Sequence, residues 1–264
     1  MPSTIPAAFS LVLLFAVLAE LAWARRSGRS IYVLGETLSN LGMMVGNQTI
    51  KPLSLAWSYF VLSWMEPLQA VRLPETGWAL VAGFLITEVT YYWYHRLSHE
   101  VPALWAMHHT HHSSPWMNFT TALRLNWVAK FVTPLFFAPL VWLGFSPTVV
   151  AGSLGVGLLY QFFLHTESVG RLGVFEGKLL NTPSAHRVHH GSNPAYIDKN
   201  YGGVFIVWDR LFGTYQPEVE DVRYGVTTGF LGHNPLTAQF RPLYNYLRGD
   251  WKTEKSIASA TKGI

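Results

Sequence analysis

Ten of the eleven histidines in this 264-residue chain fall in four short clusters. The clusters are His95-x3-His99, the run from 108 to 112, His165-Thr-Glu and His186-x2-His-His, and His233 stands alone. The chain has no cysteine, so it can form neither thiolate ligands nor disulfides, and imidazole is its main source of metal ligands. So many imidazoles in so few segments predict a fold that gathers them into a polyhistidine metal centre.

The spacing within the clusters suits helices. Residues four apart share one helix face, so His95 and His99 can point at one metal position, as can His108 and His112. His111 diverges from its neighbour by about a quarter to a third of a turn, so this segment can serve two ions. The cluster of His186, His189 and His190 has the same geometry and can also serve two ions. Two ions with four to five ligands each would use nine candidates, namely His95, His99, His108, His111, His112, His165, His186, His189 and His190.

Some histidines have an ordinary alternative role. A histidine near a membrane surface is often only a polar side chain at the level of the headgroups, and we assign that role to His233. His109 is also interpreted as a non-ligand. Taken alone, His165 fits either role, and only the other clusters favour its assignment as a ligand.

The composition predicts a membrane protein. Only 13% of the residues are charged and the mean hydropathy is +0.20, whereas soluble domains carry roughly 25% charged residues. Segments 5–24 and 77–94 contain one charge each, Glu20 and Glu88, over a length that spans hydrocarbon. Segments 127–145 and 147–164 form a predicted helical hairpin, and Lys130 near one end can snorkel. Segment 52–71 is a weaker fifth span, and 31–50 is predicted to be interfacial.

We therefore predict an all-α transmembrane bundle of four to five spans with a cytoplasmic histidine-rich cap. Arg25, Arg26 and Arg29 follow the first span, which places that loop in the cytoplasm. Five spans then put every histidine cluster on the cytoplasmic face. No basic residue precedes the first segment and no clear cleavage site follows it, so we expect a retained anchor. The basic residues are scattered, which argues against a nucleic acid partner.

The chain is predicted to be one domain, 1–264, because it shows no internal repeat, low-complexity tract or long linker. Its parts are an anchor at 5–24, a motif core at 77–215 and a cytoplasmic tail at 217–264. The tail is more charged than the rest. It is expected to form either a cap over the site or a peripheral surface helix.

The ligand type leaves the metal open, since imidazole suits zinc, copper, iron and nickel. The repeated Glu-x2-His pattern of soluble di-iron bundles is absent, and so is the His-Glu-x2-His motif of zinc proteases. A bis-histidine haem would need facing pairs within the spans, whereas these histidines stand at the ends of spans. A non-haem site with two metal ions at the membrane surface remains.

The order of the histidine clusters resembles the fatty acid hydroxylase and sterol desaturase superfamily of integral-membrane di-iron oxygenases. The segments 181–203 and 208–215, together with His165-Thr-Glu, are most similar to its alkylglycerol monooxygenase branch. The resemblance covers about 77–215. It implies that dioxygen is activated at two iron ions and that a C-H bond of an alkyl, ether or related long-chain lipid is hydroxylated.

The same resemblance implies an external electron donor, either a protein or a tetrahydropterin, and zinc in place of iron after purification. A sterol or carotenoid hydroxylase or desaturase of the superfamily is an alternative. A non-enzymatic membrane metal-binding protein is the alternative from a different class.

Two departures from the superfamily bear on further site residues. Val169 stands where some members have another histidine, so a tenth ligand would have to come from His109, His233 or Glu167. Glu88 replaces an aspartate seven residues before His95. An intramembrane carboxylate is costly, so we expect Glu88 to be the partner of a ligand histidine, with Glu167 as a second carboxylate candidate. Two more polar residues of the matched segment, Asn181 and Asp198, are additional candidates.

Overall fold

The computed structural model describes residues 4–250, with side chains from residue 11 onward. These residues form helices and no strands, as the all-α prediction requires, and only two isolated bridges add β contacts. The α-helices are α1 (Thr4–Arg26), α2 (Leu34–Met65), α3 (Gly77–Glu100), α4 (Pro102–His112), α5 (Ala129–Trp142), α6 (Pro147–Phe162), α7 (Pro183–His189), α8 (Val207–Leu211) and α9 (Pro235–Leu247). Three short 3-10 helices occupy Glu66–Leu68, Phe119–Leu123 and Gly173–Phe175.

Proline and hydroxyl side chains fix where the helices that carry the site begin. α6 and α7 start at prolines, whose missing N–H costs nothing in the first turn. Ser146 caps α6 by accepting a hydrogen bond from Val149 N, and Thr182 caps α7 by accepting one from Ala185 N. Pro102 ends α3 and begins α4, so the two helices are joined by a single residue. The two histidine-bearing helices therefore follow each other directly and pack against each other.

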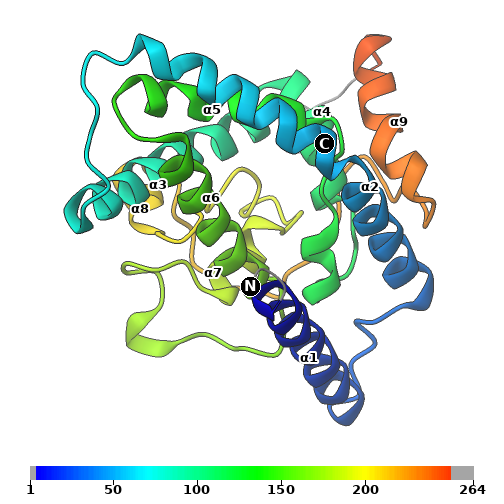
Figure 1. Ribbon diagram of the computed structural model, residues 1–264. Coiled ribbons are helices and arrows are strands. Elements are labelled where there is room, and N and C mark those ends of the chain that lie inside the picture. Colours follow the sequence, from blue (N-terminus) through cyan, green and yellow to red (C-terminus); the bar gives the residue numbers. More distant parts are fainter. Residues whose placement is uncertain (1–3, 251–264) are drawn as a thin grey trace.

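The apolar core lies among α2, α3, α5 and α6, which pack against one another around Phe137 and Val141 (Figure 1). Gly83 lets α3 approach α6 closely, because a Cβ there would lie 2.5 Å from Val149 Cγ1. In Figure 1 α1 extends away from this bundle, and α7 lies near the lower end of α6 with long loops on either side of it. The histidine-bearing ends of α3, α4 and α6 therefore meet on the side where α7 packs.

Helices occupy the segments predicted as spans, but their boundaries differ. The predicted interfacial segment 31–50 and the predicted span 52–71 form one continuous helix, α2, with Pro52 inside it. Side-chain hydrogen bonds on both sides of the proline tie α2 to the rest of the molecule, from Asn47 to Leu125 O and from Trp57 to Phe131 O. Tertiary contacts thus outweigh the local tendency of proline to end a helix.

Among the described residues, none of the helices combines the length and the apolar character that a membrane crossing needs. The predicted transmembrane spans are therefore not confirmed. α5 and α6 have 14 and 16 residues, fewer than the roughly 20 that span hydrocarbon. The longer α2 and α3 carry charged side chains along their length, such as Lys51 and Arg96.

Many large apolar side chains are exposed on α1, α2 and α3. They cover the outer faces of α1, α2 and α3, although a water-facing helix normally presents charged and polar groups there. The most exposed examples include Phe15 on α1, Leu34, Tyr59 and Trp64 on α2, and Trp78 and Val81 on α3.

The described part of the tail packs against the metal-binding half of the molecule. α9 lies against α4, with Ala238 and Gln239 completely buried between them. Thr110 of α4 donates a hydrogen bond to Ala238 O, and Asn126 donates one to Gln239 O. The two predicted roles for the tail, a cap over the site and a peripheral surface helix, both stay predictions. Residues 251–264 lie outside the described part.

Candidate metal centre

The first group of histidines comes from three helices that converge. His95 and His99 lie on the last turns of α3, His108 and His112 lie on α4, and His189 lies on α7. One ligand atom from each of these five lies within 4.8 Å of all the others. Spacing of four on both α3 and α4 produces this arrangement, because it places each pair on one helix face.

The second group is made of four buried imidazoles. His111 of α4, His165 just after α6, His186 of α7 and His190 at the end of α7 offer ligand atoms that also lie within 4.8 Å of one another. The structure thus brings all nine predicted ligands together. α4 and α7 each contribute to both groups, which is the division that their adjacent histidines predict.

Backbone carbonyls orient three of the imidazoles. Nδ1 of His95 lies 2.7 Å from Tyr201 O, Nδ1 of His165 lies 2.7 Å from Gln161 O, and Nδ1 of His189 lies 3.0 Å from a third carbonyl, that of residue 199. A carbonyl can only accept, so each Nδ1 carries the proton and donates it. The lone pair of each ring is then on Nε2, which is free to bind a cation.

The nitrogen atoms of the first group are spaced like ligands around one ion. His108 Nε2 lies 3.0 Å from His95 Nε2 and 3.1 Å from His112 Nε2. Two nitrogen atoms at about 2.0–2.1 Å from a common metal lie roughly 2.9–3.4 Å apart for right-angled or tetrahedral geometry. The observed separations therefore fit donors that share a metal ion.

The second group has the same spacing. His165 Nε2 lies 3.2 Å from His111 Nε2 and 3.0 Å from His186 Nε2. Several buried imidazole nitrogens of the two groups also have no hydrogen-bond partner among the described residues, which is costly in a protein interior unless another ligand is bound. The atoms that a metal ion could satisfy are Nε2 of His99, His189 and His190.

Burial keeps these imidazoles neutral, which is the form that binds metal. Desolvation, with a smaller contribution from repulsion by His99, lowers the pKa of His95 to about 3. Desolvation also lowers the pKa of His165 to about 4, against two backbone contacts that raise it. At neutral pH both rings are uncharged, so no proton has to be displaced for a cation to bind.

The loop after α7 serves the first group. It supplies the carbonyls of residues 199 and 201 and the carboxylate of Asp198, whose Oδ1 lies 3.7 Å from His99 Nδ1. Asp198 and Asn200 both have φ of 59°, a left-handed conformation that Asp and Asn tolerate better than most residues. The Asn200 side chain secures the loop by donating to Ala185 O of α7.

Asp209 holds the same loop from the other side, and the sequence analysis missed it. It is completely buried and accepts hydrogen bonds from Tyr201 N, Gly202 N and Thr214 Oγ1, each at 2.7 Å. Asn181, a predicted candidate, donates to Gly202 O. The role of Asn181 is thus to position this loop. The partners of Asp209 are mostly backbone groups, so no side-chain pattern in the sequence indicates its role. Its position in the segment 208–215, which carries the family resemblance, was the only indication.

Neither predicted carboxylate contacts an imidazole. Glu88 accepts a hydrogen bond from Val204 N at 2.6 Å, and Glu167 forms an ion pair with Arg29 at 2.6 Å. Glu88 is seven residues before His95, which corresponds to a rise of roughly 10 Å along the helix, so the expected direct contact does not form. Glu88 instead secures the loop whose Tyr201 carbonyl orients that histidine.

The two remaining histidines lie outside both groups. His109 points to the other side of α4, where its Nε2 lies 3.1 Å from Thr228 Oγ1. His233 is part of the tail and lies 3.0 Å from Glu36 Oε2. Within the residues that the structure describes, each group consists of histidines alone, so none of the candidates supplies a tenth ligand.

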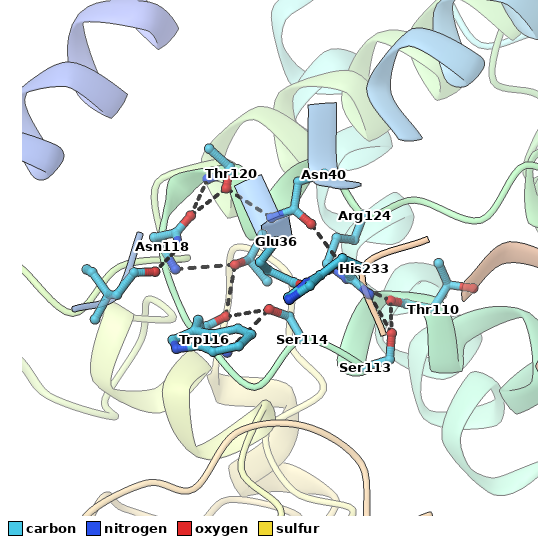
Figure 2. Close-up of polar contacts among 12 residues, drawn as sticks. Glu36, Asn40, Thr110, Ser113, Ser114, Trp116, Asn118, Thr120, Arg124 and His233 are labelled. Carbon is cyan, nitrogen blue, oxygen red and sulfur yellow. Dashed lines mark hydrogen bonds and ion pairs between the residues drawn. The ribbon is translucent and has the colours of Figure 1, made fainter. Parts of the chain in front are cut away.

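A second buried polar cluster lies behind α4, around Arg124 (Figure 2). The Arg124 side chain is 1% exposed and donates to Glu36 Oε1 at 2.7 Å, Asn40 Oδ1 at 2.8 Å, Ser113 Oγ at 2.6 Å and Thr110 O at 3.1 Å. We call these residues the Arg124 network. Thr110 lies in the last turn of α4 and Ser113 directly follows it, so the network fixes the turn that carries His111 and His112. Nothing in the sequence indicates this network, because Arg124 looks like an ordinary loop cation.

An apolar cavity of ≈350 Å³ lies between α2, α3, α4, α5 and α6. Met107 and Leu104 of α4 form part of its wall, and Phe137 and Leu154 line it from α5 and α6. One histidine from each group, His108 and His111, also lines the cavity. A long apolar ligand in this cavity would lie directly against the metal centre.

Residues 80–214 match the fatty acid hydroxylase family. The chain is 42% identical over 201 residues to alkylglycerol monooxygenase of Homo sapiens, an alignment that covers 76% of this chain and 44% of that protein. It is 45% identical over 172 residues to alkylglycerol monooxygenase of Xenopus tropicalis, covering 65% and 38%. Identity to the ornithine lipid hydroxylase OlsE of Rhizobium tropici is 27% over 217 residues, covering 79% and 64%.

The chain thus spans less than half the length of the alkylglycerol monooxygenases that it resembles. No solved structure matches it. The matched family segment contains all nine histidines of the two groups.

Proposed function

The chain belongs to the fatty acid hydroxylase family, and from this premise we propose that it is a non-haem di-iron oxygenase that hydroxylates a C-H bond of a lipid. The observation that carries the proposal is the pair of histidine groups built on α3, α4, α6 and α7. One group has five members and the other has four, so each suits one ion. His108 and His111 bring the two groups to the same apolar cavity.

The donor set fits iron. His95, His99, His108, His112 and His189 would hold one ion, and His111, His165, His186 and His190 the other. Two iron ions bound there would supply the activation of dioxygen. Imidazole also binds zinc, which ranks above ferrous iron in affinity, so zinc would displace iron on overexpression.

The chain's own residues prepare the site for this chemistry. The carbonyls of Gln161 and Tyr201 hold their histidine partners in the tautomer that binds metal. Burial of every imidazole except His99 and His108 below 9% exposure keeps bulk water away from a reactive centre. The cavity would hold an alkyl chain with its reacting carbon near His108 and His111.

Hydroxylation of R-H by dioxygen forms R-OH and water and consumes two electrons and two protons. An external donor must therefore reduce the centre in each cycle. We propose an electron-transfer protein or a reduced pterin, as the family resemblance suggests.

We further propose that the chain is embedded in a membrane, with its site toward the cytoplasm. The exposed apolar side chains of α1, α2 and α3 support contact with lipid, because their exposure to water would be costly. Arg25, Arg26 and Arg29 would then lie on the cytoplasmic side. A substrate with a long alkyl chain, such as an ether lipid, would reach the cavity from the bilayer.

Oxygen labelling tests the proposal. The protein is purified anaerobically with iron, supplied with membrane lipid and a reductant, and exposed to ¹⁸O₂. We expect two metal ions per chain and one labelled oxygen atom in a lipid product, and neither labelled product nor full metal content in the His189→Ala variant.

Other outcomes of the same assay would contradict the proposal. A new double bond without label would assign the chain to desaturation. Unchanged lipids in the presence of bound metal and an adequate reductant would favour a metal-binding protein without enzymatic activity.

A further inference from the structure

Lys130 lies on the wall of the apolar cavity that reaches the metal centre. It belongs to the first turn of α5, which packs against α2, and its side chain is half-buried. Apart from His108 and His111, it is the only ionisable basic side chain among the lining residues. The amino group of Lys130 is thus placed in an otherwise largely apolar cavity.

No group in the described part of the chain neutralises this charge. Lys130 has no ion-pair or hydrogen-bond partner there, and the charged group that acts on it is a second cation, Lys51. No aspartate or glutamate lines the cavity. The hydroxyls on the same wall are already engaged, since Ser54 donates to Lys51 O and Ser58 donates to Ser54 O. The ammonium group is therefore the donor left over for a ligand.

The balance of charge favours an anionic ligand over a neutral one. A partly desolvated ammonium group without a counter-charge is unfavourable, and an incoming anion would remove that penalty. A neutral hydroxyl or sugar headgroup would find few free donors on this wall. One charge-assisted hydrogen bond corresponds to roughly a tenfold gain in affinity.

We propose that the cavity binds a single-chain amphiphile whose anionic end group, a carboxylate or a phosphate, pairs with Lys130. Its apolar chain fills the cavity past Phe137 and Leu154 and reaches the wall formed by His108 and His111. This inference rests on the proposed function for the reaction and adds the substrate class. Lys130 is then the residue that determines selectivity for the headgroup.

Binding to zinc-loaded full-length protein in a non-ionic detergent tests the inference without any turnover. The probes are hexadecyl phosphate, hexadecanoate and hexadecanol, which share one chain and differ in the end group. We expect both anions to bind about tenfold or more tightly than the alcohol. Stronger binding of the phosphate would indicate a lipid phosphate, and stronger binding of the carboxylate would indicate a free acid.

Variants test whether Lys130 causes the preference for anionic probes. Lys130→Met should abolish it without changing hexadecanol binding, and Lys130→Arg should retain it. Lys51→Met is the matched control, since Lys51 does not line the cavity, and it should also retain the preference. Leu154→Trp should weaken binding of all three probes, because it fills the space for the chain.

Equal affinity for the three probes would overturn the inference. So would a preference that survives in Lys130→Met, or one that Lys51→Met removes to the same extent. These results are independent of the proposed function, because zinc-loaded protein performs no oxidation. A chain that binds anions through Lys130 but never incorporates oxygen would refute the proposed function and leave the assignment of the cavity intact.

Discussion

Two buried polar regions meet at the last turn of α4, and they differ in how their polar atoms are satisfied. Behind the helix, Arg124 has a partner on each of its three nitrogen atoms, and Glu36 and Asn40 accept from it. In front of the helix, the buried Nε2 atoms of His99, His189 and His190 have no hydrogen-bond partner among the described residues.

The difference separates a scaffold from a site. The Arg124 network is complete within the polypeptide, so it can fix α4 before any metal binds. The histidine groups are complete only with an added cation, because buried polar groups without partners are unfavourable. Four predictions follow from this contrast.

Loss of one histidine ligand should have the largest effect, because only the histidine groups are expected to carry the chemistry. His189→Ala should reduce lipid oxidation by roughly 100-fold or more, since loss of even an outer partner of a metal ligand costs 10–100-fold. His109→Ala, on the other face of α4, is the control and should be much milder. Steady-state rates and metal content per chain measure both effects. A dead His109→Ala with an active His189→Ala would reverse our assignment of the faces.

Loss of the Arg124 side chain should destabilise the Arg124 network. Arg124→Met leaves Glu36 buried without its partner, which should lower the free energy of unfolding by about 3–5 kcal/mol. His233→Ala is the matched control, because His233 contacts the same carboxylate but is 40% exposed, and it should cost less than about 1 kcal/mol. Denaturant unfolding of zinc-loaded protein compares them. Equal losses in the two variants would show that Arg124 is not central to the network.

Metal removal should destabilise the segments that carry the histidine groups more than the Arg124 network. At a free metal concentration of 100 to 1,000 times Kd, one site contributes about 2.7–4.1 kcal/mol. Chelation should lower Tm accordingly, and hydrogen exchange should rise at α7 and at the loop of residues 198–202 more than at residues 36–40 of α2, which contact Arg124. If both regions loosened equally, the contrast between them would be lost.

Acid should weaken the metal-free protein through its buried histidines. The folded-state pKa of His95 is lowered to about 3, below the ordinary value of 6.5, because of burial. The unfolded chain therefore binds more protons below pH 6.5, and stability falls as the pH drops from about 6.5 toward 3. Each such histidine should cost about 1 kcal/mol by pH 5.5. Denaturant unfolding of apo-protein at pH 7.5 and 5.5 measures this, and equal stability at the two values would contradict it.

The histidines that share a helix face could be predicted from the sequence, because the face that each occupies depends on local geometry. Spacing of three and four within a helix decides which imidazoles share a face, and His108 and His112 needed no other information. Helix content could be predicted for the same reason. The division of α2 into two segments was wrong, because the contacts of Asn47 and Trp57 that sustain the helix across Pro52 are long-range.

The residues that support the ligands could not be predicted. Arg124 and Asp209 act through partners that are backbone groups or lie far away in the sequence, such as Glu36, 88 residues before Arg124. The carbonyl of Gln161 is an exception. It lies four residues before His165, so the helical pattern alone could have indicated it.

The division of both histidine groups between α4 and α7 affects the order of events during synthesis. His112 leaves the peptidyl transferase centre long before His189 and His190, and at 5–20 residues per second the 77-residue interval takes roughly 4–15 s. During that interval α3 and α4 can present only part of a ligand set. Neither group of histidines can therefore be completed before α7 has been synthesised, so the earlier helices alone would offer a metal ion an incomplete set of ligands.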